Sequence, residues 1–85
     1  MVDIYCVVWH DAQGGANVGW RDIEELKTLK PAIAVSVGTI LHQDEYKLII
    51  CPHVLLEEGE LTEGDAELVI PTSWVTSLTK IYTVG

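Results

Sequence analysis

The chain has few positively charged residues, and this scarcity limits the partners that it can bind. Five lysines and arginines stand against 13 acidic residues, which gives a net charge of −8. Nucleic-acid binders normally carry the opposite sign, because neutralised phosphates supply most of their affinity, and anionic membrane surfaces attract basic segments in the same way. We therefore expect no membrane partner and only weak binding of RNA. The basic residues are Arg21, Lys27, Lys30, Lys47 and Lys80.

Cysteines and long apolar runs are also scarce. Cys6 and Cys51 could form one disulfide at most, and because both lie in apolar runs we expect two buried thiols. Residues 1–3 lack the positive start of a signal peptide, and no apolar run is long enough to span a bilayer. The expected compartment is therefore the cytoplasm.

Apolar residues, in contrast, are abundant for so short a chain. Residues 1–85 are expected to form one domain, and a chain of this size buries only about 60–65% of its unfolded surface. Yet 48% of the residues are hydrophobic. Together with the acidity, this excess predicts apolar contacts between subunits, with acidic loops kept in water.

The segment from Val35 to Cys51 is the one around which the rest of the chain is organised. Two apolar runs flank a polar tip at 42–45, which is typical of a β-hairpin. Gly38 lies inside the first run, where a glycine marks a bend, a bulge or a close backbone approach. We expect a strongly curved hairpin in which a Cβ at Gly38 would collide with a neighbouring strand.

The residues before this hairpin predict one strand, one loop and one short helix. Residues 2–9 alternate as a strand, and 10–19 form a loop with a Gly-Gly pair that lacks the lysine of a phosphate-binding loop. Residues 22–30 predict a helix capped by Asp22 and Glu25, with Trp20 packed beneath it. The expected core face of the strand is Val2, Ile4, Cys6 and Val8, and the apolar stripe of the helix is Ile23, Leu26 and Leu29.

The residues after the hairpin predict two further strands. Residues 57–67 carry six acidic residues and two glycines, which favours a solvated connector over a cation site. Strands are expected at 66–71 and 78–84, with a turn at 73–77. The fold class is therefore all-β with one short helix: five strongly bent strands in a small barrel, the helix lying between the first and second strands and over one barrel end.

The spacing within the hairpin resembles the Sm-like family of LSm and Hfq proteins. The first Sm motif places an apolar residue two positions after a glycine and an aspartate six positions after it, followed by an apolar strand. Gly38, Ile40, Asp44 and the run 48–50 fill this pattern, and Tyr46 matches the aromatic residue that Hfq carries two positions after the aspartate. The resemblance extends to Sm-like proteins of cyanophage origin, which would act in the cytoplasm of the host cell.

The second Sm motif is matched only in its apolar positions. Ile70, Val75 and Leu78 fill those positions, but Pro71 and Thr72 replace the Arg-Gly pair of the family. Leu48 stands where eukaryotic and archaeal members have a base-contacting asparagine. The Lys-His pair of Hfq falls on Thr72 and Ser73, and the family's helix normally precedes the first strand.

The resemblance implies a non-enzymatic protein that forms a homo-oligomeric ring of about five to seven subunits and binds RNA weakly or a protein partner. A monomeric interaction module that uses an exposed barrel edge is the alternative. The positions implied for binding are Asp44, Tyr46, Lys47, Thr72 and Ser73. The positions implied for the subunit interface are Leu68, Val69, Ile70, Lys80, Ile81 and Tyr82.

Catalysis has weaker support in the sequence. Either cysteine with a histidine, or Asp44 with His42, could supply reactive groups, and Cys51 and His53 point the same way along a strand. A nucleophile also needs a third group that orients its base, and none is evident. We therefore expect no enzyme, no cofactor and no metal site.

Overall fold

Strands dominate the computed structural model, which describes residues 1–14 and 19–85. They account for 64% of the structure and helical turns for 9%, so the predicted all-β class with one short helix is confirmed. The predicted loop at 10–19 lies partly outside the described residues, because its glycine pair includes Gly15. The elements are β1 (Val2–Asp11), α1 (Ile23–Leu26), β2 (Ala32–Gln43), β3 (Lys47–Cys51), β4 (His53–Glu57), β5 (Glu60–Asp65), β6 (Leu68–Pro71), the 3-10 turn η1 (Thr72–Trp74) and β7 (Val75–Val84).

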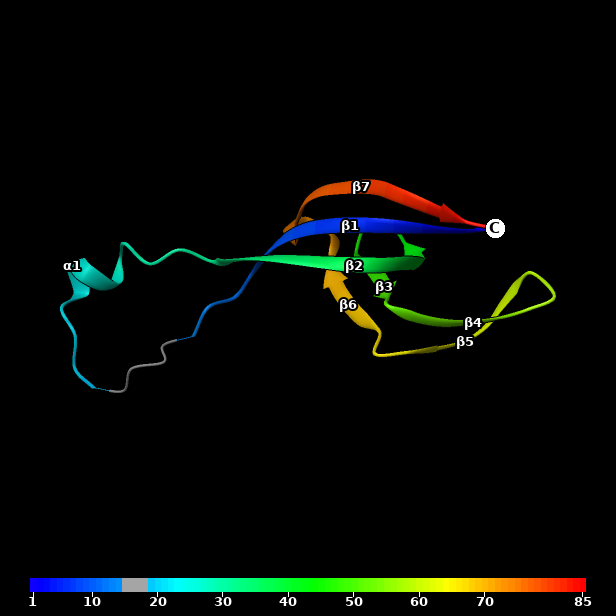
Figure 1. Cartoon of the computed structure of the whole chain (residues 1–85). Coiled ribbons are helices and arrows are strands. Elements are labelled where there is room, and N and C mark those ends of the chain that lie inside the picture. The colour runs from blue at the N-terminus through cyan, green and yellow to red at the C-terminus, as the bar shows by residue number, and fades with distance from the viewer. Residues whose placement is uncertain (15–18) are drawn as a thin grey trace.

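Five of these strands form one antiparallel sheet in the order β6-β3-β2-β1-β7 (Figure 1). The remaining two, β4 and β5, pair with each other as a separate hairpin. The sheets are not closed into a barrel. As a result β6 and β7 are the two edges of the five-stranded sheet, and their backbone groups on the outer side have no partner strand within this order.

The bend in β2 depends on the missing side chain of Gly38. A Cβ built there would lie 2.6 Å from the carbonyl oxygen of Cys51 and 2.8 Å from its carbonyl carbon. Real Cβ atoms do not approach backbone atoms this closely, so only glycine allows β2 to pass β3 at this point. The predicted collision at Gly38 is therefore confirmed.

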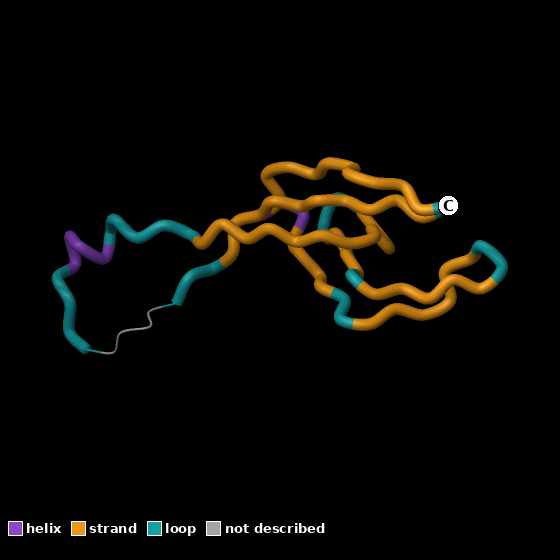
Figure 2. The backbone as a smooth tube through the Cα atoms, viewed as in Figure 1, coloured by secondary structure: helices purple, strands orange, loops and turns teal. Residues whose placement is uncertain are grey.

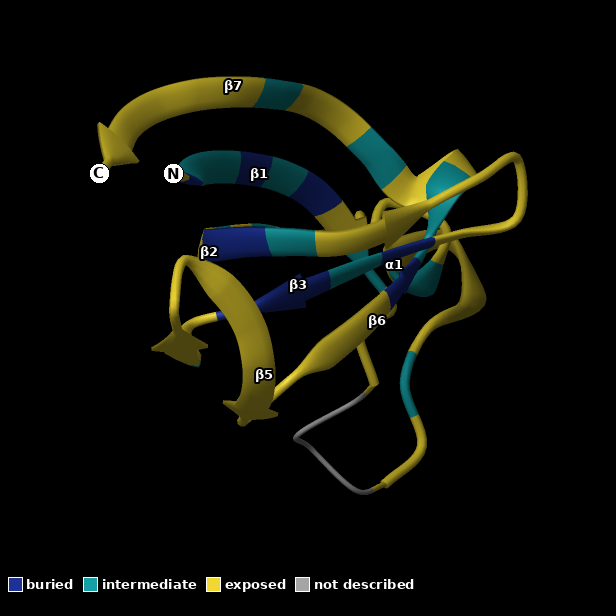
Figure 3. Ribbon diagram, turned by 90° about the vertical axis from the view of Figure 1, so that its right-hand side faces the viewer, coloured by how far each residue is buried: buried dark blue, intermediate teal, exposed yellow. Residues whose placement is uncertain are grey.

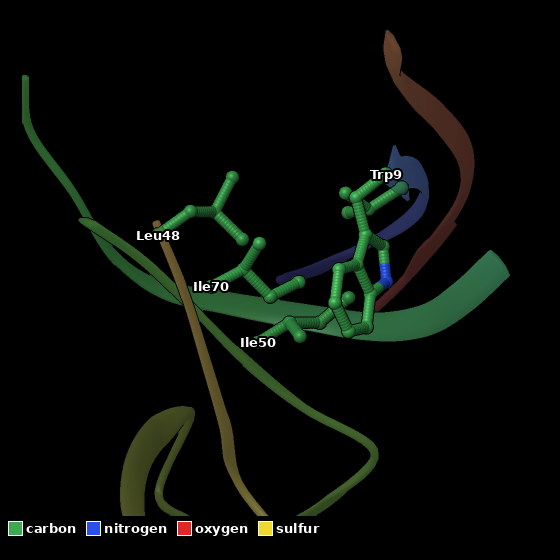
Figure 4. Packing of buried hydrophobic residues seen from close by; sticks show 5 residues of the cluster. Trp9, Leu48, Ile50 and Ile70 are labelled. Carbon is green, nitrogen blue, oxygen red and sulfur yellow. The ribbon is translucent and has the colours of Figure 1, made fainter. Parts of the chain in front are cut away.

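The core is small and lies on one face of the bent sheet. It consists of Val7, Trp9, Leu48, Ile50 and Ile70, which Figure 4 shows packed together with all but Val7 labelled. Figure 3 shows that buried residues are confined largely to β1, β2 and β3, whereas β5 and most of β7 are exposed.

The predicted core face of the first strand is wrong in most of its members. Val7 and Trp9 are buried in the core, whereas Cys6 and Val8 are only half-buried on the opposite face. Both faces of this strand are apolar, so alternation alone does not select one. The pairing decides, because Trp9 lies opposite Ala34 and its indole N–H donates to the Ser36 hydroxyl at 3.1 Å.

The segment between β1 and β2 differs most from expectation. The helix covers only residues 23–26, and its end tightens into i→i−3 hydrogen bonds before Pro31. The helix lies beyond the end of the sheet rather than over it (Figure 1). The Trp20 side chain is fully exposed instead of packed beneath the helix. Asp22 does cap the helix, but Glu25 pairs with Arg21 instead of completing a capping box.

The acidic segment 57–67 is also more ordered than the predicted connector. Residues 60–65 form β5 and pair with β4, so loop appears only at short turns in this region (Figure 2). The expected strand at 66–71 begins at Leu68, and the expected turn at 73–77 is replaced by η1 and the early start of β7 at Val75. Within the described residues no helix is long and apolar enough to cross a membrane.

Replacing Gly38 tests the close approach of β2 and β3. We expect Gly38→Ala to lower the free energy of unfolding by about 1–3 kcal/mol, because the new methyl group meets backbone atoms that cannot easily move aside. Chemical denaturation measures the change. Gly14→Ala is the matched control, since no atom lies within 4 Å of a Cβ at that position. Equal stability of both variants would place the bend elsewhere.

Candidate functional site

The tip of the β2–β3 hairpin is held in shape by one carboxylate. The Oδ1 atom of Asp44 accepts hydrogen bonds from the backbone N–H groups of Tyr46 and Lys47, each at 2.8 Å. Its Oδ2 atom lies 2.7 Å from Nε2 of His42. Asp44 N–H in turn donates to the carbonyl oxygen of Lys47 at 2.9 Å. Asp44 therefore has a structural role in this turn, which fits the preference of aspartate for turns that it caps itself.

These contacts favour the ionised form of the carboxyl group. The hydrogen bond with His42, followed by those from the backbone of Lys47 and Tyr46, lowers the pKa of Asp44 from 3.8 to about 2. The carboxylate is therefore charged at every physiological pH. A negative charge fixed at the tip repels phosphate, so it weighs against an anionic ligand at this position.

A second segment, distant in sequence, is tied to this tip. The Thr72 hydroxyl donates to the carbonyl oxygen of Asp44 at 2.8 Å, and the Thr72 N–H donates to the carbonyl oxygen of Tyr46 at 3.0 Å. Lys47 lies opposite Pro71 in the β3–β6 pairing. The structure thus brings together four of the five positions implied for binding. The fifth position, Ser73, is the next residue of η1 and lines a hollow beside Trp74.

The side chains available at this site are few. Tyr46 is 76% exposed, so its ring does not pack in the core and is open to stacking. Lys47 supplies one positive charge, beside the carboxylates of Asp44 and Glu45. Leu48 is fully buried, so the position that holds a base-contacting asparagine in Sm proteins is a core position here.

An aromatic pair next to this site was not anticipated from the sequence. The rings of Trp9 and Trp74 stack with centroids 6.5 Å apart and planes 13° apart. Trp74 remains partly exposed and lines a shallow hollow of about 400 Å³ together with His10 and Pro31. The only sequence signal was a tryptophan in a predicted turn, and spacing could not place it against a residue 65 positions earlier.

Of the groups considered for catalysis, His42 and Asp44 lie 2.7 Å apart at the hairpin tip, whereas Cys51 is not hydrogen-bonded to a histidine ring. The Cys51 thiol is buried and donates to the backbone carbonyl oxygens of His53 and Asp65, not to an imidazole ring. Cys6 is half-buried on the other face of the sheet, and both thiols are free. Among residues 1–14 and 19–85 no three His, Cys, Asp or Glu side chains converge as a metal site would require.

The positions implied for a subunit interface lie mostly on open edges. Val69 on β6 is 55% exposed and Ile81 on β7 is 53% exposed, and Leu68, Lys80 and Tyr82 are exposed as well. Ile70 is different, because its side chain is fully buried in the core. It stabilises the domain and leaves no surface for a partner.

No protein family, curated protein or solved structure matches this chain.

The lowered pKa of Asp44 gives a testable pH dependence. Because the folded value lies below 3.8, the stabilisation from the ionised carboxylate is complete above about pH 4 and is lost as the pH falls toward 2. We expect the carboxyl carbon resonance of Asp44 to titrate near pH 2, and nearer to 3.8 in His42→Ala. The stability difference between the parent and Asp44→Asn should shrink over the same range. A titration midpoint of Asp44 near pH 3.8 in the parent protein would contradict the lowered pKa.

Proposed function

We propose that this chain is a non-enzymatic, Sm-like subunit that assembles with copies of itself into a closed ring. In this proposal the bent five-stranded sheet takes the place of the small Sm barrel. The β6 edge of one subunit pairs with the β7 edge of the next. Such head-to-tail contacts use two different surfaces, so they must close into a ring or continue as a filament.

The observation that carries the proposal is the pair of open apolar edges. A solitary protein usually protects such edges with lysines, prolines or bulges. Here Pro71 ends β6, Lys80 is the one charged residue of β7, and the β1–β7 pairing contains two register shifts. Large apolar side chains nevertheless remain exposed on these edges, among them Val69, Ile81 and Tyr82. Pairing the two edges would satisfy backbone groups and remove this apolar surface from water at the same time.

Ring formation is tested by the mass in solution. We expect light scattering at tens of micromolar to give a multiple of 9.4 kDa. Ile81→Asp and Val69→Asp should each reduce the mass toward the monomer, because each places a charge on one paired edge.

Val35→Asp is the matched control for both edge variants. It adds the same charge at an exposed valine of β2, which pairs with Val8 and belongs to neither outer strand, and it should leave the mass unchanged. A parent protein of 9.4 kDa would reject the ring and favour the monomeric interaction module. Folded edge variants of unchanged mass would place the interface elsewhere.

Binding of RNA at the hairpin tip is expected to be weak and strongly dependent on salt. Tyr46 can stack on one base, but the charge of −8 and the two tip carboxylates oppose a polyanion. We expect oligouridine to bind more weakly than about 1 µM at physiological salt.

Tyr46→Ala should weaken the binding of oligouridine about tenfold, measured by fluorescence anisotropy. Trp20→Ala is the control, because it removes an exposed aromatic ring that lies far from this site. Nanomolar binding at physiological salt would overturn the expectation and make RNA the principal ligand.

A further inference from the structure

The hollow beside Trp74 combines an aromatic wall with a carboxylate. It has a volume of about 400 Å³ and lies where the end of β1 meets η1 and the start of β7. Its lining includes Asp11, Ser73, Trp74 and Thr76. Of these four residues, only Ser73 is among the positions considered above for binding, so the hollow is a separate feature of the surface.

The aromatic wall of the hollow is held in place from behind. Trp74 stacks on Trp9, with ring centroids 6.5 Å apart and planes 13° apart. Trp9 is itself buried, and its indole N–H donates to the Ser36 hydroxyl at 3.1 Å. Trp74 keeps 39% of its surface exposed. A ring that is already fixed in this way loses little conformational freedom when a flat group stacks on it.

The carboxylate lies on the same side of β1 as this wall. Asp11 follows Trp9 by two positions, so the two side chains leave the same face of the strand. Asp11 is half-buried, and the described residues that line the hollow include no lysine or arginine. Lys30 precedes Pro31 at the rim, but no ion pair joins it to Asp11 within the described part of the chain. The charge of Asp11 is therefore available to a ligand.

The charges at the hollow select a positively charged ligand. The whole chain carries a net charge of −8, which attracts cations to its surface and repels phosphates and other anions. The face of an indole ring attracts a cation as well, because its π-electrons form a negative surface. The carboxylate of Asp11 and the ring of Trp74 thus favour the same sign of charge.

The shape of the lining selects a flat cation. Trp74 is the one aromatic residue among the described residues that line the hollow, whereas quaternary ammonium groups are bound by cages of aromatic rings. A guanidinium group is planar, so it can stack on one ring and donate two N–H groups to one carboxylate. The Thr76 hydroxyl donates to the carbonyl oxygen of Val8 at 3.0 Å and can still accept through its lone pairs, as can the Ser73 hydroxyl.

We propose that the hollow binds a guanidinium group, stacked on the Trp74 ring and held by the Asp11 carboxylate. The group belongs either to an arginine side chain of a partner protein or to a small free guanidinium compound. The site lies within one chain and uses neither sheet edge, so it goes beyond the ring and stands or falls separately from it.

Methylguanidinium is the probe, with methylurea and methylammonium as matched controls. Methylurea has the same flat shape without the charge, and methylammonium has the charge without the plane. The NMR titration is run at about pH 8, where histidine side chains are generally neutral. We expect methylguanidinium to shift the Trp74 indole N–H resonance saturably and to bind about tenfold more tightly than either control. Equal binding of either control, or no shift at tens of millimolar probe, would reject the site.

Contacts between protons locate the probe on the protein. We expect nuclear Overhauser effects between the methyl protons of methylguanidinium and the ring protons of Trp74. Trp20 is the internal control, because its ring is fully exposed and does not line the hollow. Effects of equal strength at both rings would show unspecific association with exposed indoles and overturn the proposal.

Two aspartate variants test the role of the carboxylate. Asp11→Asn should weaken the binding of methylguanidinium about tenfold and leave that of methylurea unchanged. Asp3→Asn removes the same charge from the opposite end of β1, outside the hollow, and should leave both unchanged. Equal losses in both variants would show a general effect of net charge and reject the specific site.

A blocked tripeptide with arginine between two glycines distinguishes the two sources of the group. Binding at least as tight as that of methylguanidinium would support a site for an arginine side chain of a protein. Exclusion of the tripeptide, with methylguanidinium still bound at Trp74, would support a site for a small free compound.

Discussion

The close approach of three strands at Cys51 is the constraint on which the rest of the structure depends. Gly38 lets β2 pass over the backbone of Cys51, and Gly64 lets β5 pass over its sulfur, which would lie 2.8 Å from a Cβ there. The thiol fills the remaining space and donates to the carbonyl oxygens of His53 and Asp65. Two glycines and one small buried thiol thus let the chain leave the five-stranded sheet here and begin the β4–β5 hairpin. A larger side chain at any of the three positions would separate the strands.

This geometry leaves the domain with a core that is too small for its apolar content. Five residues form the buried cluster, although nearly half of the chain is hydrophobic. The surplus is exposed on β2, on the two sheet edges, on the β4–β5 hairpin and on residues 19–31. A domain of this size has only a small free energy of unfolding by itself. Burial of these surfaces between copies would therefore stabilise the fold as well as the assembly. Folding and association are then expected to be linked.

The parts of the fold that the sequence predicts correctly are those that local pattern controls. The bend at Gly38 follows from a glycine within an apolar run. Strand β2 follows from the apolar runs that flank the polar tip, and residues 78–84 of β7 follow from alternation. The core face of β1 cannot be predicted from local pattern, because both faces of this strand are apolar. Only the pairing with β2, in which Trp9 lies opposite Ala34, buries the Trp9 side chain. At the candidate site, the turn at Asp44 is a local property. Its bond to Thr72, 28 residues away, depends on the β3–β6 pairing that spacing alone cannot reveal.

The distribution of charge explains how so acidic a chain could associate specifically. Strand β2 has no acidic, lysine or arginine residue, β6 has none either, and β7 has only Lys80. The carboxylates gather instead at the β2–β3 tip and along the β4–β5 hairpin. Contacts between sheet edges therefore join nearly uncharged surfaces and leave the carboxylates in water, whereas contacts between two tips or two hairpins meet repulsion between like charges. In the proposed assembly, repulsion between the acidic segments would disfavour the other orientations and would cost little where two sheet edges meet. The charge would then select the geometry of the proposed ring without supplying its energy. In the proposed ring that energy would come from burial of the exposed apolar side chains.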